Sequence, residues 1–145
     1  MLLEGKKALI MGVANNRSIA YGISSAFARE GARLAFSYAG DAIKKRVEPI
    51  SEELGGEFTL PCDVSSDDDI AAAAELVKEK WGKIDVLVHS VAYAPKEELA
   101  GRYLDTSRNG FKVAMDISAY SLVALCRAFE PLMDAGSSVI CMTYY

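Results

Sequence analysis

The stretch KALIMGVANNRSIAYG (residues 7–22) joins an apolar run to a helical pattern, and it decides the fold of this chain. KALIM is typical of a buried strand, while the residues after Ser18 carry the periodicity of a helix that runs to Glu30. The turn between them has glycine at Gly12 and Gly22, so the common G-x-G-x-x-G spacing of a phosphate loop is absent. Whether such a turn can still bind a phosphate depends on its other residues.

A phosphate site at this turn needs backbone N–H groups that face the ligand and a helix N-terminus behind them. Asn15 and Asn16 tolerate left-handed turns, and Ser18 supplies a hydroxyl that can cap a helix beginning at Ile19. We expect Gly22 to let this helix pack closely on a sheet. The pattern therefore favours a stretched phosphate loop, with an ordinary strand-to-helix turn as the alternative.

The rest of the chain repeats the alternation of apolar runs and helical patterns. The runs are continuously apolar, as in VLVH and VICM, which is typical of parallel strands covered on both faces. Short connections between them predict an α/β fold with a doubly wound parallel sheet. The predicted strands are Lys7–Gly12, Arg33–Tyr38, Glu57–Pro61, Ile84–Ser90 and Ser137–Thr143, and the predicted helices are Ile19–Glu30, Asp41–Leu54, Asp67–Trp81 and Ile117–Met133. We expect Asp41 and Asp67 to cap their helices.

Two parts of the chain depart from this pattern. Residues 93–111 contain a proline and two glycines and predict a loop region with at most a short helix. The last predicted strand is apolar on both faces and carries no charge or proline that would protect a sheet edge. A dinucleotide-binding sheet has about six strands, and five are predicted. We therefore expect a sheet truncated after the fifth strand, with residues 1–145 as the N-terminal portion of a single-domain, dinucleotide-binding protein.

Composition narrows the classes of partner. The chain has 145 residues and a net charge of −4, and its basic residues form no stripe that would favour nucleic acid. No apolar run is long enough to predict a membrane span, and the N-terminus lacks the pattern of a signal peptide. The three cysteines, Cys62, Cys126 and Cys141, lack metal-ligand spacing and are interpreted as small buried apolar residues in a reducing, cytoplasmic setting.

Further motifs give the chain a recognisable signature. They are GVANNRSIAYGI at 12–23, CDV at 62–64, HSVAYAP at 89–95, GF at 110–111, DISAYS at 116–121 and TYY at 143–145. With them the chain resembles the NADH-dependent enoyl-acyl-carrier-protein reductases of bacterial fatty-acid synthesis, a branch of the short-chain dehydrogenase/reductase superfamily. The resemblance covers the whole chain in order and about the N-terminal half of a typical family member. The family's later Y-N-x-M-G-x-A-K motif is not in these residues.

The resemblance implies an NAD site and no metal. The pyrophosphate and nearby ribose would rest on Gly12, Ser18 and Ile19. Ala39 falls where the family often has a polar residue near the adenosine ribose, which is a departure. The strand before it ends at Tyr38 without the acidic residue or arginine that would discriminate the two nicotinamide cofactors, so the preference for NADH comes from the resemblance alone.

In the family, Asp63 and Val64 would hold the adenine, by a carboxylate and a backbone N–H; without the family, Asp63 could equally be a turn residue before a helix. Val91 would lie beside the ribose and nicotinamide. The sequence S-V-A-Y around Val91 replaces the N-N-A-G of most relatives in the superfamily, which argues against a carbonyl reductase.

The substrate end of the site is also implied by resemblance. Tyr93 and Ala94 would line the acyl pocket, and Tyr144 would be an active-site tyrosine that hydrogen-bonds the thioester oxygen. The family's second tyrosine and lysine would follow Tyr145. His89, the only histidine, is expected to have a structural role.

The implied reaction is the reduction of trans-2-enoyl-acyl carrier protein, the last step of the elongation cycle, in a homotetramer that forms through the helix Ile117–Met133. Lacking the later motif, the 145-residue chain alone is expected to be inactive. Two alternatives stay open at this point: a carbonyl-reducing member of the same superfamily, and a non-catalytic nucleotide-binding domain.

Overall fold

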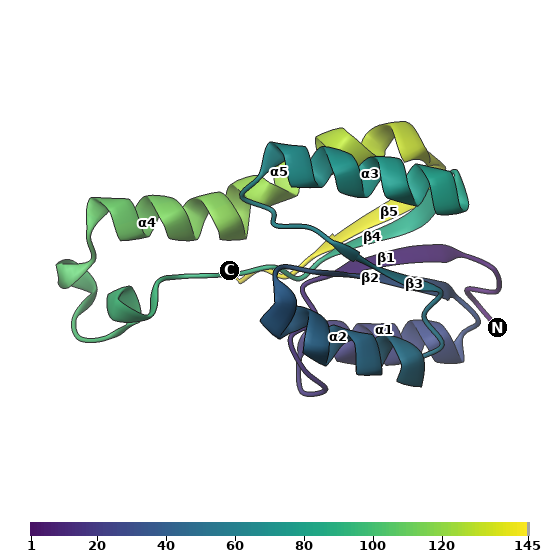
Figure 1. The fold of residues 1–145 in the computed structure, drawn as a ribbon, viewed down its shortest axis with the longest axis horizontal. Helices are drawn as coiled ribbons and strands as arrows, with labels where there is room; N and C mark the ends of the chain where they lie inside the picture. The colour runs from purple at the N-terminus through teal and green to yellow at the C-terminus, as the bar shows by residue number, and fades with distance from the viewer. Residues whose placement is uncertain (145) are drawn as a thin grey trace.

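The computed structural model describes residues 1–144, so Tyr145 lies outside the described residues. Its centre is a parallel five-stranded sheet in the order β3-β2-β1-β4-β5 (Figure 1). The strands are β1 (Lys7–Met11), β2 (Arg33–Tyr38), β3 (Phe58–Pro61), β4 (Ile84–His89) and β5 (Met133–Cys141). The predicted doubly wound α/β fold is confirmed, with strand ends shifted by a few residues.

Helices cover both faces of the sheet, which is why its strands are apolar throughout. The helices α1 (Ile19–Arg29) and α2 (Asp41–Glu53) lie on one face, and α3 (Asp67–Trp81) and α5 (Ser121–Phe129) lie on the other (Figure 1). Successive β1 residues point to opposite faces, so Ala8 and Ile10 pack toward α1 and α2 while Leu9 and Met11 pack toward α3 and α5. The sheet therefore has two cores, one on each side.

Several predicted helix ends are wrong in detail. The side chain of Ser66, and not that of Asp67, caps α3 by accepting from the backbone N–H of Asp69. Asp41 is the first residue of α2 and follows Gly40, which caps it without a side-chain bond. Ser66 serves as the cap of α3 because it has the extended backbone that an N-cap residue requires, whereas Asp67 is already the first residue of the helix.

The role predicted for Gly22 is also wrong. A Cβ at this position would meet nothing within 4 Å, so Gly22 faces solvent and not the sheet. The close approach of α1 to the sheet is provided by Ala20 and Ser24, which are fully buried.

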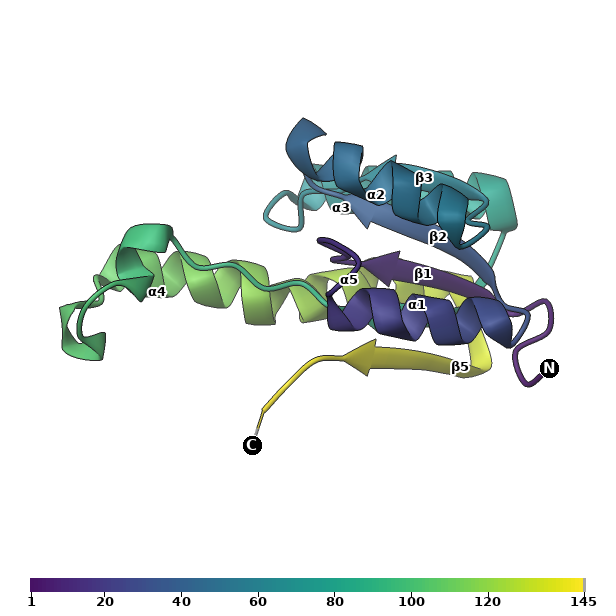
Figure 2. The ribbon, with the colours of Figure 1, turned by 90° about the horizontal axis from the view of Figure 1, so that it is seen from below.

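The helix predicted at Ile117–Met133 begins earlier and contains an irregular turn. It consists of α4 (Arg108–Met115), a π-helical turn (Asp116–Tyr120), α5 and a 3-10 turn (Glu130–Leu132). The predicted loop region thus contains the first half of α4, preceded by 3-10 turns at Lys96–Leu99 and Tyr103–Asp105. We call residues 95–115 the projecting arm, because they extend beyond the end of the sheet (Figures 1 and 2).

The last strand also differs from its prediction. β5 begins at Met133 and ends at Cys141, and most of its residues are exposed. It lies at one edge of the described sheet, as Figure 2 shows. Of the three cysteines, Cys62 is buried as expected, but Cys126 is only partly buried and Cys141 is exposed. Trp81, at the end of α3, is buried in the core.

None of the helices in residues 1–144 is both long enough and apolar enough to cross a membrane.

Candidate functional site

A cleft of about 450 Å³ lies at the carboxyl edge of the sheet. It is lined by the ends of β1, β2, β3 and β4, with Ile117 of the π-helical turn closing one side. The chain leaves β1 toward β2 on one side and β4 toward β5 on the other, so β1 and β4 form the point where the strand order reverses. In open α/β sheets this reversal opens a crevice that binds ligands.

Gly12 forms the floor of the cleft directly after β1. Its φ is +96°, a conformation that residues with side chains rarely adopt, and a Cβ there would lie 1.9 Å from the Ser90 carbonyl oxygen. Two backbones therefore pass each other at a distance that only glycine permits. This gives a physical reason for glycine at position 12.

The turn after Gly12 is ordered by its own polar side chains. The Asn15 side chain accepts from the Arg17 N–H at 2.8 Å, and the Ser18 hydroxyl donates to the Asn15 carbonyl at 2.7 Å. The Ser18 oxygen also accepts from the Tyr21 N–H at 3.3 Å, so it caps α1 as predicted. Ser18 and Ile19 do not line the cleft itself, and Ile19 is exposed. They bring the N-terminus of α1, with its unpaired N–H groups, to the cleft entrance.

Ala39, Asp63 and Val64 line the end of the cleft at β2 and β3. One carboxylate oxygen of Asp63, Oδ1, accepts from both the backbone N–H and the hydroxyl of Ser65, at 2.9 and 2.6 Å. These bonds hold the pKa of Asp63 below its ordinary value, so the side chain is ionised at neutral pH. Asp63 is thus a turn residue and a cleft residue at once.

The opposite end of the cleft is lined by the segment after β4, including Val91 and Tyr93. The Ser118 hydroxyl accepts from the Tyr93 N–H at 2.9 Å and donates to the Tyr93 carbonyl at 3.1 Å. The sequence motif contained Ser118, but its contact with Tyr93 could not be foreseen, since it depends on the π-helical turn. Ile117 also lines the cleft and was missed for the same reason, whereas Ser90, at the end of a predicted strand, could have been found from its position at the carboxyl edge.

His89 lies at the end of β4, buried behind the cleft. Its Nε2 lies 2.8 Å from the Ser121 hydroxyl, whose single proton is donated to the Ile117 carbonyl at 2.6 Å. His89 must therefore carry a proton on Nε2 and donate it to Ser121. Burial lowers the pKa of His89, which favours the neutral ring. The arrangement is in keeping with the structural role expected for this histidine.

Two predicted site residues lie outside the cleft lining. Ala94 follows Tyr93 but does not line the cleft. Tyr144 is three residues beyond the end of β5, and 93% of its surface is exposed. Tyr144 lies beyond the strand because the ladder between β4 and β5 stops at Cys141, two residues before the predicted strand end at Thr143. Its catalytic role stays a prediction.

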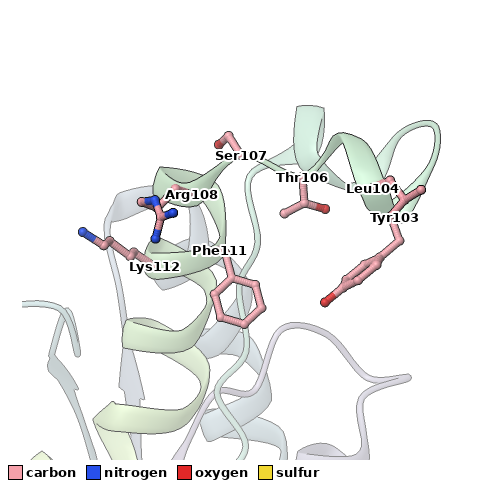
Figure 3. A pocket seen from close by; sticks show the side chains of 7 residues that line it. All are labelled: Tyr103, Leu104, Thr106, Ser107, Arg108, Phe111 and Lys112. Atoms are coloured by element: carbon pink, nitrogen blue, oxygen red, sulfur yellow. The ribbon is translucent and has the colours of Figure 1, made fainter.

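A second hollow, of about 610 Å³, lies on the projecting arm. Figure 3 shows the rings of Tyr103 and Phe111 extending into the same open space between α4 and the 3-10 turn. Arg108 and Lys112 contribute cationic side chains from α4. This hollow is remote from the carboxyl edge of the sheet and is bordered by highly exposed residues, so the cleft at Gly12 is the better candidate for a ligand site.

Comparison with known proteins gives consistent relatives. The NADH-dependent enoyl-[acyl-carrier-protein] reductase FabI of Aquifex aeolicus (strain VF5) is 54% identical over 145 residues, which cover 99% of this chain and 54% of that protein. An NADH-dependent enoyl-[acyl-carrier-protein] reductase of Rhizobium meliloti (strain 1021) is 51% identical over 144 residues, 99% of this chain and 53% of its own length. The chain therefore spans about half the length of the curated relatives it matches.

Solved structures agree with the fold. The crystal structure of the Aquifex aeolicus enzyme superposes with a TM-score of 0.96 and covers all of this chain and 58% of that one. The reductase of Anaplasma phagocytophilum, solved in complex with NAD, has a TM-score of 0.94 at 45% identity and covers 100% of this chain and 56% of that one. The family described as Enoyl-(Acyl carrier protein) reductase matches residues 12–145. With this match, these identities and the shared sheet, the chain belongs to the enoyl-acyl-carrier-protein reductase family.

Proposed function

We propose that residues 1–145 form the dinucleotide-binding portion of a single-domain, NADH-dependent reductase that converts trans-2-enoyl-acyl carrier protein to acyl-acyl carrier protein. The observation that carries the proposal is the cleft at the β1–β4 reversal, with Gly12 at its floor. Two further facts support it. The curated relatives are named for this reaction with NADH, and one structural relative was solved with NAD.

The cleft fits a dinucleotide on its own geometry. Gly12 leaves a cradle that a Cβ would fill, and the N-terminus of α1 brings N–H groups and a positive dipole end to the same entrance. Gly12, Ser18 and Ile19 would hold the pyrophosphate and its ribose from this side. When bound, the cofactor supplies the hydride that reduces the carbon–carbon double bond.

The other groups have roles that follow from their chemistry. Asp63 keeps one carboxylate oxygen on Ser65, which leaves Oδ2 to accept from the exocyclic amine of adenine. Val64 would offer its backbone N–H and an apolar surface to the ring, and Ala39 leaves room for the adenosine ribose. Val91, at the opposite end of the cleft, would pack against the nicotinamide half.

The substrate would enter from the Tyr93 side. Tyr93 is about half exposed at the edge of the cleft, where its ring can pack against an acyl chain together with Ala94. Tyr144 would donate a hydrogen bond to the thioester oxygen as negative charge develops there, a contribution of about 3–4 kcal/mol in comparable sites. An acyl carrier protein would present the substrate as its partner.

The helical segment of residues 117–133 would also form contacts between subunits. Tyr120 and Val123 are about half exposed on the side of the helix away from the sheet core. A homotetramer that forms through residues 117–133 would bury these apolar groups. With no membrane or nucleic-acid partner proposed, we place the protein in the cytoplasm.

The first test is cofactor binding by the chain itself, with Asp63→Asn as the decisive variant. Asparagine keeps an oxygen for Ser65 but replaces the free carboxylate oxygen with an N–H donor, which opposes the adenine amine. We expect affinity for both NADH and AMP to fall by about tenfold, the value of one charge-assisted hydrogen bond. Titration calorimetry measures both ligands.

Asp68→Asn is the matched control, because it makes the same charge change at an exposed residue of α3 that does not line the cleft. Equal loss of affinity in the two variants, or absence of NADH binding by the parent chain, contradicts the proposal. The reaction is then checked in the protein that carries these residues, by the NADH-dependent reduction of a crotonyl thioester, with ketone substrates as the comparison for a carbonyl reductase.

A further inference from the structure

We propose that Ser118 is a positioning residue that fixes the cofactor-facing wall of the cleft by clamping the backbone of Tyr93. The inference rests on the proposed function, since it assigns the residue a role toward the nicotinamide half of the cofactor.

The wall in question is the irregular segment after β4. Strand pairing ends at the Ser90 N–H, which donates to the Met11 carbonyl at 2.9 Å, and the next helical turn begins only at Lys96. Residues 91–94 therefore run from the end of β4 to that turn without a ladder or a helix of their own, and residues 91–93 line the cleft. A segment of this kind needs side chains to hold its backbone.

Ser118 supplies that support by bonding both backbone polar groups of one residue, Tyr93. Its hydroxyl accepts from the Tyr93 N–H and donates to the Tyr93 carbonyl, at 2.9 and 3.1 Å. A single hydroxyl that binds both polar groups of one residue fixes the orientation of that peptide as well as its distance. Val91 and Tyr93, which line the cleft, are thereby held in place relative to Ile117, the cleft residue that precedes Ser118.

The π-helical turn is what lets Ser118 reach the segment. A π turn widens the helix by one residue and is frequent at functional sites. Within this turn, Ile117 points into the cleft and Ser118 reaches Tyr93, while Ser121, directly after it, meets His89 at 2.8 Å. The turn is thus attached to the chain on both sides of Val91, at His89 and at Tyr93. Regular α-helical spacing would rotate these neighbours away from one another.

The test compares two ligands on the same chain. ADP-ribose contains the adenosine and pyrophosphate of NADH but lacks the nicotinamide. We expect Ser118→Ala to weaken NADH by about five- to tenfold, as the loss of two neutral hydrogen bonds would. ADP-ribose affinity should stay within about twofold, because its contacts lie toward Gly12 and Asp63. Ser118→Thr, which keeps the hydroxyl, should restore the parent ratio of the two affinities.

A second readout follows the clamp directly. Hydrogen exchange of the Tyr93 amide, measured by NMR, should become at least about tenfold faster in Ser118→Ala. Ser24→Ala is the control, since it also removes a helical hydroxyl, one that bonds only to the Ala20 carbonyl in α1. It should change neither the affinity ratio nor the exchange of Tyr93.

The outcomes separate this inference from the proposed function. If the parent binds both ligands but Ser118→Ala leaves their ratio and the Tyr93 exchange unchanged, the positioning role is wrong while the cofactor site stands. If Ser118→Ala weakens both ligands equally, the residue is merely structural and the inference is overturned. If the parent binds neither ligand, the proposed function fails, and the positioning role falls with it.

Discussion

The central sheet and the projecting arm contain similar apolar side chains and bury them to opposite extents. Leu9 of β1 is completely buried between two helical layers, whereas Leu104 and Tyr103 of the arm are 77% and 80% exposed. The sheet residues have neighbours above and below, while residues 95–115 extend beyond both layers (Figure 2). Apolar side chains therefore stabilise the fold only where packed layers bury them, as in the sheet and not in the arm.

The difference predicts that the two regions unfold separately. The sheet and its helices should open only with the whole molecule, since their residues share two continuous cores. The arm depends on local bonds, such as the Ser107 cap of α4 and the Glu98 carboxylate that accepts from the Ser107 N–H at 2.8 Å. It should open at lower free energy. Paired substitutions of the same type test this contrast.

The largest effect is expected from leucine truncation. Leu9→Ala removes a side chain enclosed on all sides and should lower the free energy of unfolding by about 3–5 kcal/mol, through lost burial and a residual cavity. Leu104→Ala, the same change on the arm, should stay within about 0.5 kcal/mol. Urea unfolding, measured at the same protein concentration for both variants, gives the two values. A similar loss for the two variants would show that the arm belongs to the folded core.

Glycine replacement should distinguish Gly12, in the turn after β1, from Gly22, within α1. Gly12→Ala places a Cβ 1.9 Å from the Ser90 carbonyl oxygen at a φ of +96°, and should destabilise the protein by about 2–4 kcal/mol through strain and backbone displacement. Gly22→Ala puts its Cβ in open space within a helix and should stabilise by up to about 1 kcal/mol. Thermal unfolding of the two variants gives opposite signs. Equal signs would contradict the close backbone approach at Gly12.

Helix caps offer a comparison between sheet and arm at smaller scale. Ser66 caps α3, which packs on the sheet, and Ser107 caps α4 in the arm. Each serine accepts a hydrogen bond from a backbone N–H three residues later. Ser66→Ala should lower global stability by about 1 kcal/mol, because α3 unfolds with the core. Ser107→Ala should instead accelerate amide exchange within the arm and leave the global free energy nearly unchanged. If Ser107→Ala lowers the global free energy of unfolding, the arm unfolds together with the sheet, which contradicts separate unfolding.

The smallest effect concerns two carboxylates. The Arg33 guanidinium binds Glu57 at 2.5 and 2.9 Å, and with the Trp81 N–H it lowers the pKa of Glu57 from 4.5 to about 2. Because the folded pKa is depressed, this group stabilises the fold above pH 4.5, and the contribution is lost as the pH falls toward 2. Both side chains are more than a third exposed, so solvent screening limits the pair to less than about 1 kcal/mol.

Glu57→Gln should therefore flatten part of the pH dependence of unfolding between pH 4.5 and about pH 2, while its amide oxygen can still accept from Trp81. Glu98, whose pKa is lowered by hydrogen bonds from Ser107, is the matched carboxylate on the arm. Glu98→Gln should leave the pH dependence of global unfolding unchanged. If the free energy of unfolding has the same pH dependence in the parent and in Glu57→Gln, the Arg33–Glu57 pair does not stabilise the sheet and its helices.

The sequence alone determined the sheet, its parallel direction and the position of the phosphate-loop turn. Continuous apolar runs such as VLVH can be satisfied only by strands covered on both faces, and the Ser18 cap follows from local chemistry within one turn. These features depend on residues close together in the chain. Gly12, Ala39, Asp63 and Val91 each lie at or just after the end of a predicted strand, and the carboxyl ends of parallel strands share one edge of the sheet, so their common location was predictable.

Only the tertiary structure decided which side chains meet across that edge. The π-helical turn breaks the periodicity from which the helix was predicted, so neither the start of α4 nor the contact of Ser118 with Tyr93 could be read from spacing. The fifth strand was predicted to end at Thr143, two residues too late, because the end of β5 is set by its ladder with β4 and not by its own apolar pattern. Strand ends and helix register are fixed by hydrogen bonds between distant segments, whereas strand existence and helix caps are fixed by neighbours in sequence.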